Sequence, residues 1–190
     1  MQFWRAQGRD ERINKMITLL EYLYYKEEVE WRDCIYYPHL KEIQEYNKNL
    51  IEAYPFLRPR NRWTDKVAED YDYTYTELDA MPRGWRINFG MDMVEEISQE
   101  LKKYNFEDKY RIIQIKEKWG GLRWYDGGWP QGSQIGRIVA KYENLSYKIC
   151  IECGDLAVYE SQGWISPYCA NCANEENEYY RELTVEDYLK

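Results

Sequence analysis

Two Cys-x-x-Cys pairs near the C-terminal end constrain this chain more than any other feature of its sequence. Cys150 and Cys153 form the first pair, Cys169 and Cys172 form the second, and 15 residues (154–168) separate them. Each pair can form a tight knuckle that directs two thiolates at one ion, and the loop between them is long enough for a short hairpin. Four soft thiolates held tetrahedrally suit Zn²⁺ and leave no coordination position for water. The spacing therefore predicts a closed, structural zinc site.

Disulfide bonds and a redox pair are the alternatives to this zinc site. Disulfides need an oxidising compartment, and residues 1–8 lack the apolar run of a secretory signal peptide. A thioredoxin-like site expects one Cys-x-x-Cys at a strand-to-helix turn, whereas this chain has two pairs. Chance is disfavoured because four of the five cysteines fall in this block. We expect the fifth, Cys34, to be a buried or half-buried free thiol.

Composition limits the possible partners. The 190 residues suffice for one domain, or for one domain with a small appendage. The formal net charge of −8 disfavours a general nucleic-acid coat, because sequence-independent affinity comes from cationic contacts to phosphate; a local basic patch stays open. The mean hydropathy of −0.84 predicts no membrane span. The chain has 20 Tyr and 8 Trp but only 4 Phe, and such amphipathic rings suit interfaces and stacking surfaces as well as half-buried core positions.

The pattern of apolar residues predicts an α+β fold in three regions. Region 1–54 carries two amphipathic helices, the first over 11–30 with Asp10 as its N-cap, and we expect them to form a helical pair. Region 55–148 is expected to hold a small antiparallel sheet with packed helices. Region 149–190 is expected to hold the four-cysteine zinc knuckle or ribbon and an acidic tail with a short helix.

Turn residues and periodicity place the elements of the central region. Tyrosines at every second position predict a strand at 71–76. A helix with Asp79 as its N-cap is expected to continue to about residue 104, and its expected apolar face consists of Trp85, Phe89, Met93, Ile97 and Leu101. Another helix is expected to begin near Ser133. A strand at 110–118 is expected to form a hairpin through a turn at Gly120-Gly121. We expect the zinc module to fix the end of the second helix against this hairpin.

Three short stretches that combine arginine with tryptophan, at 58–63, 83–86 and 119–125, form the candidate binding site. Two prolines favour an extended segment at 54–64, in which alternating arginines point to the same side. In an acidic protein these arginines can equally pair with nearby acids. If the stretches converge, they suit a nucleotide, but the same residue types also build protein-binding hot spots. The candidate ligand-binding residues are Arg58, Arg60, Arg62, Trp63, Arg86, Trp119 and Arg123.

The sequence selects no catalytic centre. The acids nearest the arginine-tryptophan stretches are Glu77, Asp79, Glu117 and Asp126, and two of them with a metal ion would suffice to hydrolyse a phosphodiester. Their spacing singles out no pair. His39 is the only histidine and is expected to be a surface or capping residue at a helix start. Because no nucleophile-and-base arrangement is visible, we rank an enzyme below a binding protein.

Several motifs occur in combination over about residues 54–172. They are YPFLRPRNRW (54–63), YTYTELDAMPRGW (73–85), IKEKWGGLRWY (115–125), CIECG (150–154) and GWISPYCANC (163–172). Together they resemble a group of small bacteriophage and prophage proteins that carries no assigned activity. The resemblance implies a bacterial cytoplasm during infection. Small phage proteins of this kind often act by binding a host component, including immune proteins or their nucleotide signals.

Two function hypotheses follow. The first is a non-enzymatic binding protein that blocks or sequesters a host component, such as a bacterial defence protein. The alternative is a nucleotide-binding or nucleotide-cleaving protein that uses the arginine-tryptophan stretches. In both hypotheses Zn²⁺ is structural and the partner is a host protein or a nucleotide, while the oligomeric state is open.

Overall fold

The computed structural model describes residues 40–173 and 180–189, and it has the expected α+β fold. The helix expected at 11–30 lies outside the described residues, as do Asp10, Cys34 and His39. Of the expected N-terminal helical pair, only the second helix is therefore described. The elements in chain order are α2 (Leu40–Ala53), η1 (Pro55–Leu57), η2 (Glu77–Ala80), α3 (Arg83–Trp85), η3 (Arg86–Gly90), α4 (Met91–Lys102), β1 (Ile112–Lys118), β2 (Gly121–Asp126), α5 (Ile135–Ser146), β3 (Tyr159–Ser161), β4 (Pro167–Tyr168), β5 (Tyr180–Glu182) and α6 (Val185–Leu189). The elements η1 and η2 are 3-10 helices, and η3 is a π-helix.

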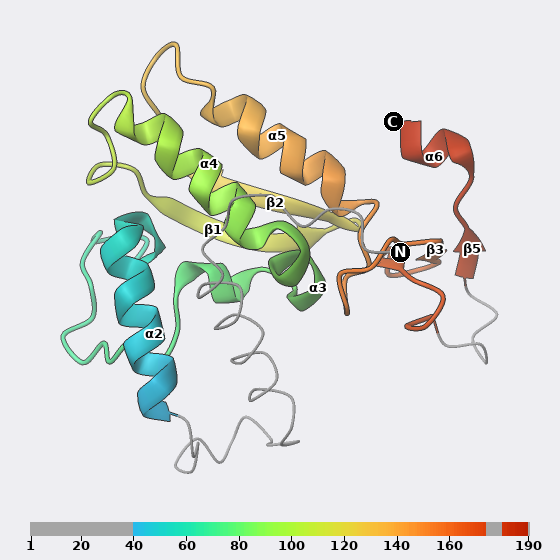
Figure 1. The fold of residues 1–190 in the computed structure, drawn as a ribbon, viewed down its shortest axis with the longest axis horizontal. Helices are drawn as coiled ribbons and strands as arrows, with labels where there is room; N and C mark the ends of the chain where they lie inside the picture. The colour runs from blue at the N-terminus through green and yellow to red at the C-terminus, as the bar shows by residue number, and fades with distance from the viewer. Residues whose placement is uncertain (1–39, 174–179, 190) are drawn as a thin grey trace.

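The hydrophobic core is built on one face of the β1–β2 hairpin. Ile115, Leu122 and Trp124 are buried there, and they alternate with more exposed residues along the strands. Such alternation is expected when an antiparallel ribbon buries one face and exposes the other. The helices α4 and α5 run side by side along the hairpin, with α2 at one end of this core and the C-terminal module at the other (Figure 1). The tip of the hairpin therefore points toward the C-terminal module.

A single helical stretch, α3–η3–α4, supplies the largest share of the core. Trp85, Phe89, Met93, Ile97 and Leu101 recur every four residues, and all five are buried, which confirms the expected apolar face. The stretch widens to a π-helix at η3, a feature the periodicity did not predict.

The expected N-cap of this helix is wrong. Asp79 is the third residue of η2, and its Oδ2 accepts hydrogen bonds from the backbone N–H (2.6 Å) and the hydroxyl (3.0 Å) of Thr76. Thr76 is therefore the N-cap of η2, the short helix that precedes the long one. Thr76 and Asp79 together form a capping box there.

The expected strand at 71–76 is also wrong. Asp72 Oδ1 accepts hydrogen bonds from the backbone N–H (3.1 Å) and hydroxyl (2.7 Å) of Thr74, and Tyr73 has a left-handed φ of 65°. A local turn of this kind competes with sheet pairing. The Tyr71 ring instead contacts the rings of Tyr73 and Tyr75, with centroids 5.0 and 5.6 Å apart.

The expected hairpin at 110–126 is confirmed, with its turn one residue earlier than predicted. Lys118 pairs with Gly121, so Trp119 and Gly120 form a two-residue loop with φ of 55° and 73°. Gly121 is the first residue of β2. The following helix, α5, has Gln134 as its N-cap rather than Ser133. The Gln134 backbone N–H donates to Glu100 Oε1 (2.8 Å). A side chain near the end of α4 therefore accepts a hydrogen bond from a backbone N–H at the start of α5.

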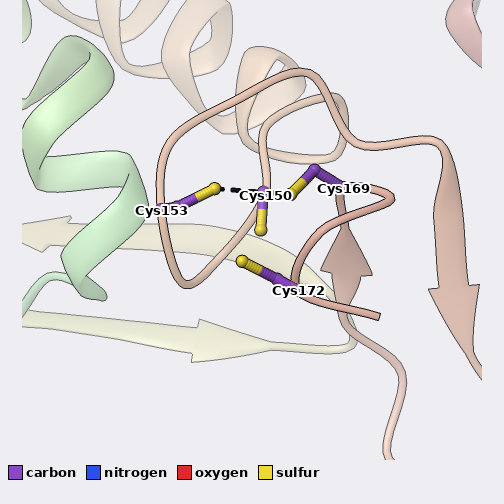
Figure 2. Close-up of side chains that lie close together, drawn as sticks. All are labelled: Cys150, Cys153, Cys169 and Cys172. Atoms are coloured by element: carbon purple, nitrogen blue, oxygen red, sulfur yellow. Dashed lines mark hydrogen bonds between the residues drawn. The ribbon is translucent and has the colours of Figure 1, made fainter. Parts of the chain in front are cut away.

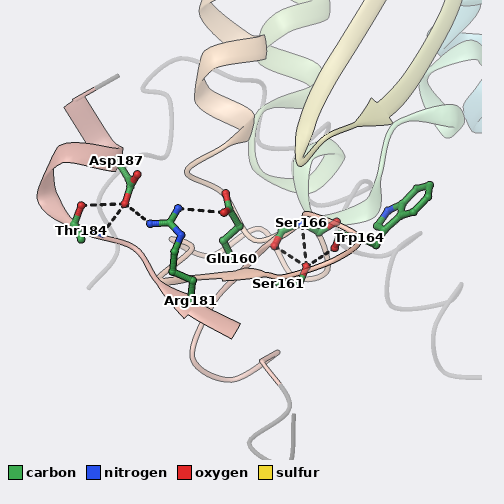
Figure 3. A network of polar contacts seen from close by, with 7 residues as sticks. All are labelled: Glu160, Ser161, Trp164, Ser166, Arg181, Thr184 and Asp187. Atoms are coloured by element: carbon green, nitrogen blue, oxygen red, sulfur yellow. Dashed lines mark hydrogen bonds and ion pairs between the residues drawn. The ribbon is translucent and has the colours of Figure 1, made fainter. Parts of the chain in front are cut away.

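The C-terminal module has a small antiparallel sheet with strand order β4–β3–β5. The acidic tail forms the expected short helix, α6, and adds the strand β5, which was not predicted. Arg181 of β5 lies between Glu160 of β3 and Asp187 of α6, at 3.1 and 2.8 Å (Figure 3). Among the helices of the described segments, none has the length and apolar character needed to cross a membrane.

Candidate functional site

The four cysteine thiols converge on one point, as the spacing predicts (Figure 2). The Sγ atoms of Cys150, Cys153, Cys169 and Cys172 all lie within 4.8 Å of one another, and Cys153 Sγ lies 3.4 Å from Cys169 Sγ. Thiolates at about 2.3 Å from a tetrahedral Zn²⁺ are about 3.8 Å apart. The spacing of the sulfurs therefore fits one metal ion held by four thiolates.

Two similar backbone turns direct these thiols. In the first turn the N–H of Gly154 donates to the carbonyl of Cys150 (3.1 Å), and in the second the N–H of Ala173 donates to the carbonyl of Cys169 (2.9 Å). Gly154 has a left-handed φ of 83°, which favours glycine. Each turn brings its two cysteines to the same side of the chain, so the sequence Cys-x-x-Cys fixes the ligand geometry locally.

The electrostatics of the cluster favour a bound cation. Burial raises the pKa of the Cys153 thiol, and it raises the pKa of the Cys172 thiol to about 11. Burial acts in the same direction on Cys169, but hydrogen bonds from Cys153 and from the backbone N–H of Cys172 outweigh it and lower the pKa. Four thiolates this close repel one another, and a coordinated cation removes that repulsion and deprotonates the thiols. The donor set therefore suits a metal ion.

The first turn of the module is anchored to the start of the long helix. The N–H of Gly84 donates to the carbonyl of Ile151 (2.8 Å), and Asn88 Nδ2 donates to the carbonyl of Gly154 (2.7 Å). A Cβ on Gly84 would lie 2.0 Å from the carbonyl oxygen of Cys150, so only glycine permits this approach. Trp85 Nε1 donates to the carbonyl of Ile149 (2.9 Å). The C-terminal module with the four cysteines, here called the metal module, is thus fixed to α3 and η3. The sequence did not predict this contact.

The expected contact between the module and the hairpin is present, but it is smaller than the contact between the module and α3 and η3. A Cβ on Gly120 would lie 3.0 Å from Ile165 Cγ2, so the hairpin tip rests against the loop between β3 and β4. Ser161 holds this loop: its Oγ donates to the carbonyl of Trp164 (2.6 Å) and accepts from the N–H of Ser166 (2.9 Å). The Trp164 indole points away from this network and is 80% exposed (Figure 3).

The structure places the seven predicted ligand-binding residues in two groups. The first group lies before and within the long helix. Arg60 Nη1 donates to the Asp65 carbonyl (2.8 Å), and Arg86 pairs with Asp79 (2.5 Å). The Arg58 guanidinium lies 6.0 Å from the centroid of the Tyr73 ring. Of the alternating arginines, Arg60 therefore pairs with a nearby acid, Asp65, as the alternative expected. Arg58 contacts an aromatic ring instead.

Trp63 and Arg62 complete this first group on an exposed turn. Asn61 Oδ1 accepts from the backbone N–H groups of Trp63 (2.9 Å) and Thr64 (3.0 Å), which holds the turn. The Trp63 side chain is 93% exposed. Arg62 is exposed beside it.

The second group is at the hairpin and consists of Trp119 and Arg123. The Trp119 side chain is 65% exposed at the turn. Arg123 Nη2 donates to the hydroxyl of Tyr147 (2.8 Å), and its guanidinium lies 5.9 Å from the centroid of that ring. Within the described segments, no hydrogen bond, ion pair or ring contact joins this group to the first.

Three residues near the second group were missed by sequence reasoning. Lys116 and Lys118 alternate with Glu117 along β1, and this alternation was the signal that places them on the outer face. Tyr147 follows α5 and contacts the hairpin only through the tertiary fold, so no local pattern indicated it.

Three of the four candidate catalytic acids have a structural role. Asp79 caps η2, and Glu117 Oε1 accepts from the N–H of Gly120 (2.7 Å) at the hairpin turn. Asp126 accepts hydrogen bonds from the hydroxyl of Tyr110 (3.0 Å) and the N–H of Gly128 (2.9 Å), and burial raises its pKa. Burial also raises the pKa of Glu77. The described structure therefore singles out no carboxylate pair for hydrolysis.

No protein-family model, curated protein or solved structure matches this chain.

Proposed function

We propose that this protein is a non-enzymatic binding protein whose recognition surface is the seam between the hairpin tip and the metal module. Gly120 of the hairpin tip and Ile165 of the module lie against each other across this seam. Each directly follows an exposed tryptophan, Trp119 and Trp164 respectively. Tryptophan and arginine are the residues that most often dominate protein-protein binding energy. The two indoles are therefore the proposed anchors.

The backbone at Trp119 is the single observation that carries this proposal. A two-residue hairpin loop with positive φ at both positions favours Asn-Gly, yet this chain has tryptophan at φ 55°. The left-handed conformation costs about 1 kcal/mol for a residue with a Cβ, and an indole that is 65% exposed recovers little of it by burial. Strain that the fold itself does not need indicates a function outside the chain.

The metal is proposed to be Zn²⁺, with Cys150, Cys153, Cys169 and Cys172 as its four ligands. Four thiolates close the coordination shell, so the ion supplies folding free energy and activates no water. Its role is to hold the loop that carries Trp164 against the hairpin tip.

The proposed partner is a host protein in the bacterial cytoplasm, such as a defence protein that this chain blocks or sequesters. The resemblance to bacteriophage and prophage proteins supports that setting. The nucleotide alternative is less favoured, because it needs the arginines around one ligand, and Arg60 and Arg86 already pair with Asp65 and Asp79.

The test compares two tryptophan variants as baits in lysate from the bacterial host. Trp119→Asn removes the indole and supplies the residue that the turn favours, so the hairpin should fold at least as well. Trp63→Ser removes an even more exposed indole, which belongs to the first group, and is the matched control. We expect wild type and Trp63→Ser to capture the same host protein, identified by mass spectrometry and confirmed with the purified partner. Capture by Trp119→Asn at wild-type strength would overturn the proposal. So would a nucleotide released from the denatured wild-type protein in the absence of any protein partner.

A further inference from the structure

The outer face of the β1–β2 hairpin carries a row of cations and aromatic rings. In the strand register Lys116 lies opposite Arg123, Lys118 lies opposite Gly121, and Tyr125 lies opposite Gln114. These positions alternate with Ile115, Leu122 and Trp124, which are buried in the core. The two strands therefore divide their side chains between the core and an open polar face.

Two cation-aromatic contacts hold this face in place. Lys116 Nζ lies 5.2 Å from the centroid of the Tyr125 ring, and the Arg123 guanidinium lies 5.9 Å from that of Tyr147. Arg123 Nη1 also donates to the carbonyl of Leu122 (2.7 Å). With Nη2 bound to the Tyr147 hydroxyl (2.8 Å), two of the five guanidinium N–H donors are engaged. The remaining donors stay available on a side chain whose orientation is already fixed.

The position of Tyr147 depends on the glycine at the start of β2. A Cβ on Gly121 would lie 2.3 Å from Cζ and 2.5 Å from the hydroxyl of Tyr147. The ring thus occupies the space that any other residue would need. This close approach brings Tyr147, which follows α5, to the same face as Arg123.

Ion pairing separates the cations of this face from seven other cations of the described structure. Among the described residues, no carboxylate forms an ion pair with Lys116, Lys118 or Arg123, whereas Arg60, Arg86, Lys102, Lys103, Arg111, Lys141 and Arg181 each have one. Glu117, the acid between the two lysines, is committed to the N–H of Gly120. In a chain with a formal net charge of −8, three such cations on one face form a local positive surface.

We infer that this face binds a short acidic segment of the partner protein, with its carboxylates on Lys116, Lys118 and Arg123 and an apolar side chain against Trp119. The inference rests on the proposed function and identifies the chemistry of the partner. Carboxylates match the fork of a preoriented guanidinium. Trp119 at the end of the row supplies apolar contact area, which is where most of the affinity of such an interface arises.

The size of the face favours a protein segment over a nucleic acid. Strands rise about 3.3 Å per residue, so Lys116 and Lys118 span about 7 Å. That length accommodates two or three anions. Nucleic-acid affinity grows with the number of phosphates neutralised. The row of cations is too short for many phosphates, because it ends at Asp126 on β2 and at the indole of Trp119. A few carboxylates beside an apolar residue fit these limits better than a polyphosphate chain.

The test titrates three defined probes into ¹⁵N-labelled, zinc-loaded full-length protein and follows the amide signals by NMR. The probes are the blocked peptide Glu-Glu-Leu-Glu-Glu, its counterpart with glutamine at every glutamate, and the oligonucleotide (dT)6. We expect the acidic peptide to shift the amides of β1, β2 and Trp119, and the glutamine peptide to bind at least about tenfold more weakly. Tighter binding of (dT)6 than of the acidic peptide would overturn the inference. Equal binding of the two peptides would overturn it as well.

Charge variants separate this inference from the proposed function. Lys116→Gln/Lys118→Gln removes two cations from the exposed face and should weaken acidic-peptide binding at least about tenfold. Lys102→Gln/Lys103→Gln changes the net charge equally at the end of α4 and should leave binding unchanged. A native amide spectrum for both variants confirms their folding. If Trp119→Asn loses the host partner while Lys116→Gln/Lys118→Gln keeps both the partner and the peptide, the proposed function stands and the acidic-segment inference fails.

Discussion

The helical core buries Met93, Ile97 and Leu101 completely, whereas the metal module buries almost no large apolar side chain. The buried residues in the described part of 149–189 are Ile149, Cys150, Gly154, Ala157, Ser166, Pro167 and Cys169. Two of these are metal-site cysteines, and most of the others are small. The core can thus be stabilised by apolar burial alone, while the proposed metal would supply the free energy that offsets the conformational entropy of the module.

The two regions also differ in the surface they present. Many charged groups of the core are paired, as with Lys141 and Glu96 between α5 and α4. The seam between hairpin and module instead presents Trp119 and Trp164 to solvent. A rigid core that holds the loop between β3 and β4 can keep two exposed indoles in fixed positions.

Removal of metal ligands should have the largest effect and should separate the two regions. In Cys153→Ser/Cys172→Ser the module loses an ion whose binding contributes about 10 kcal/mol to comparable small sites. We expect elemental analysis to find about one zinc per wild-type chain and none in the variant. Circular dichroism should retain the helical signal of α4 and α5. A metal-free wild-type protein with a folded module, measured under reducing conditions, would contradict the comparison.

A pair of glycine variants tests the anchorage between the regions. Gly84→Ala places a Cβ 2.0 Å from the carbonyl oxygen of Cys150, where backbone must move. We expect it to lower the free energy of unfolding by about 3 kcal/mol. Gly90→Ala in the same helical stretch meets its nearest atoms at 3.5 Å, with φ of −54°. It should leave stability unchanged or raise it by up to about 1 kcal/mol. Equal effects in urea unfolding would show that the close approach of Gly84 does not join the two regions.

The pH dependence of the core can be tested at Glu100. Hydrogen bonds from Lys103 Nζ and from the N–H of Gln134 hold the pKa of this carboxyl below its ordinary value. A lowered folded-state pKa stabilises the fold above the unfolded-state pKa of about 4.3, and this contribution is lost as the pH falls through the lower folded value. Glu100→Gln should therefore be less stable than wild type at pH 7. The difference should shrink below pH 4.3, and a constant difference across this range would contradict the assignment.

The smallest effect is expected at the C-terminal strand. Arg181 bridges Glu160 and Asp187 on the surface, and exposed ion pairs contribute little. Arg181→Ala should lower the free energy of unfolding by less than about 1 kcal/mol. Zinc content should not change, because the four ligands lie outside this contact. Loss of zinc in this variant would show that β5 and α6 support the metal site.

Local sequence patterns predicted most of the elements. The four metal-site cysteines, the apolar face of the long helix and the β1–β2 hairpin each depend on spacing within one short segment, and all are confirmed. The turn was misplaced by one residue because Trp119-Gly120 is a poorer turn sequence than Gly120-Gly121 by local preference. That departure from local preference supports the proposal that Trp119, already a candidate ligand-binding residue in the sequence, contacts a partner.

Contacts between distant segments were not predictable in the same way. The role of Gly84 depends on Cys150, and the place of Tyr147 depends on Gly121. The pairing of Arg86 depends on an acid in a different short helix. Each requires knowledge of how the elements pack, which periodicity does not provide.

Hydrogen-deuterium exchange before and after chelation of the wild-type protein tests the central claim most directly. If the metal module positions the recognition surface and the core folds independently, chelation should remove protection from residues 149–173 and increase exchange at Trp119 and Gly120. The amides of α4 and α5 should keep their protection. Retained protection of the module without metal would contradict the account, as would an equal loss of protection in α4.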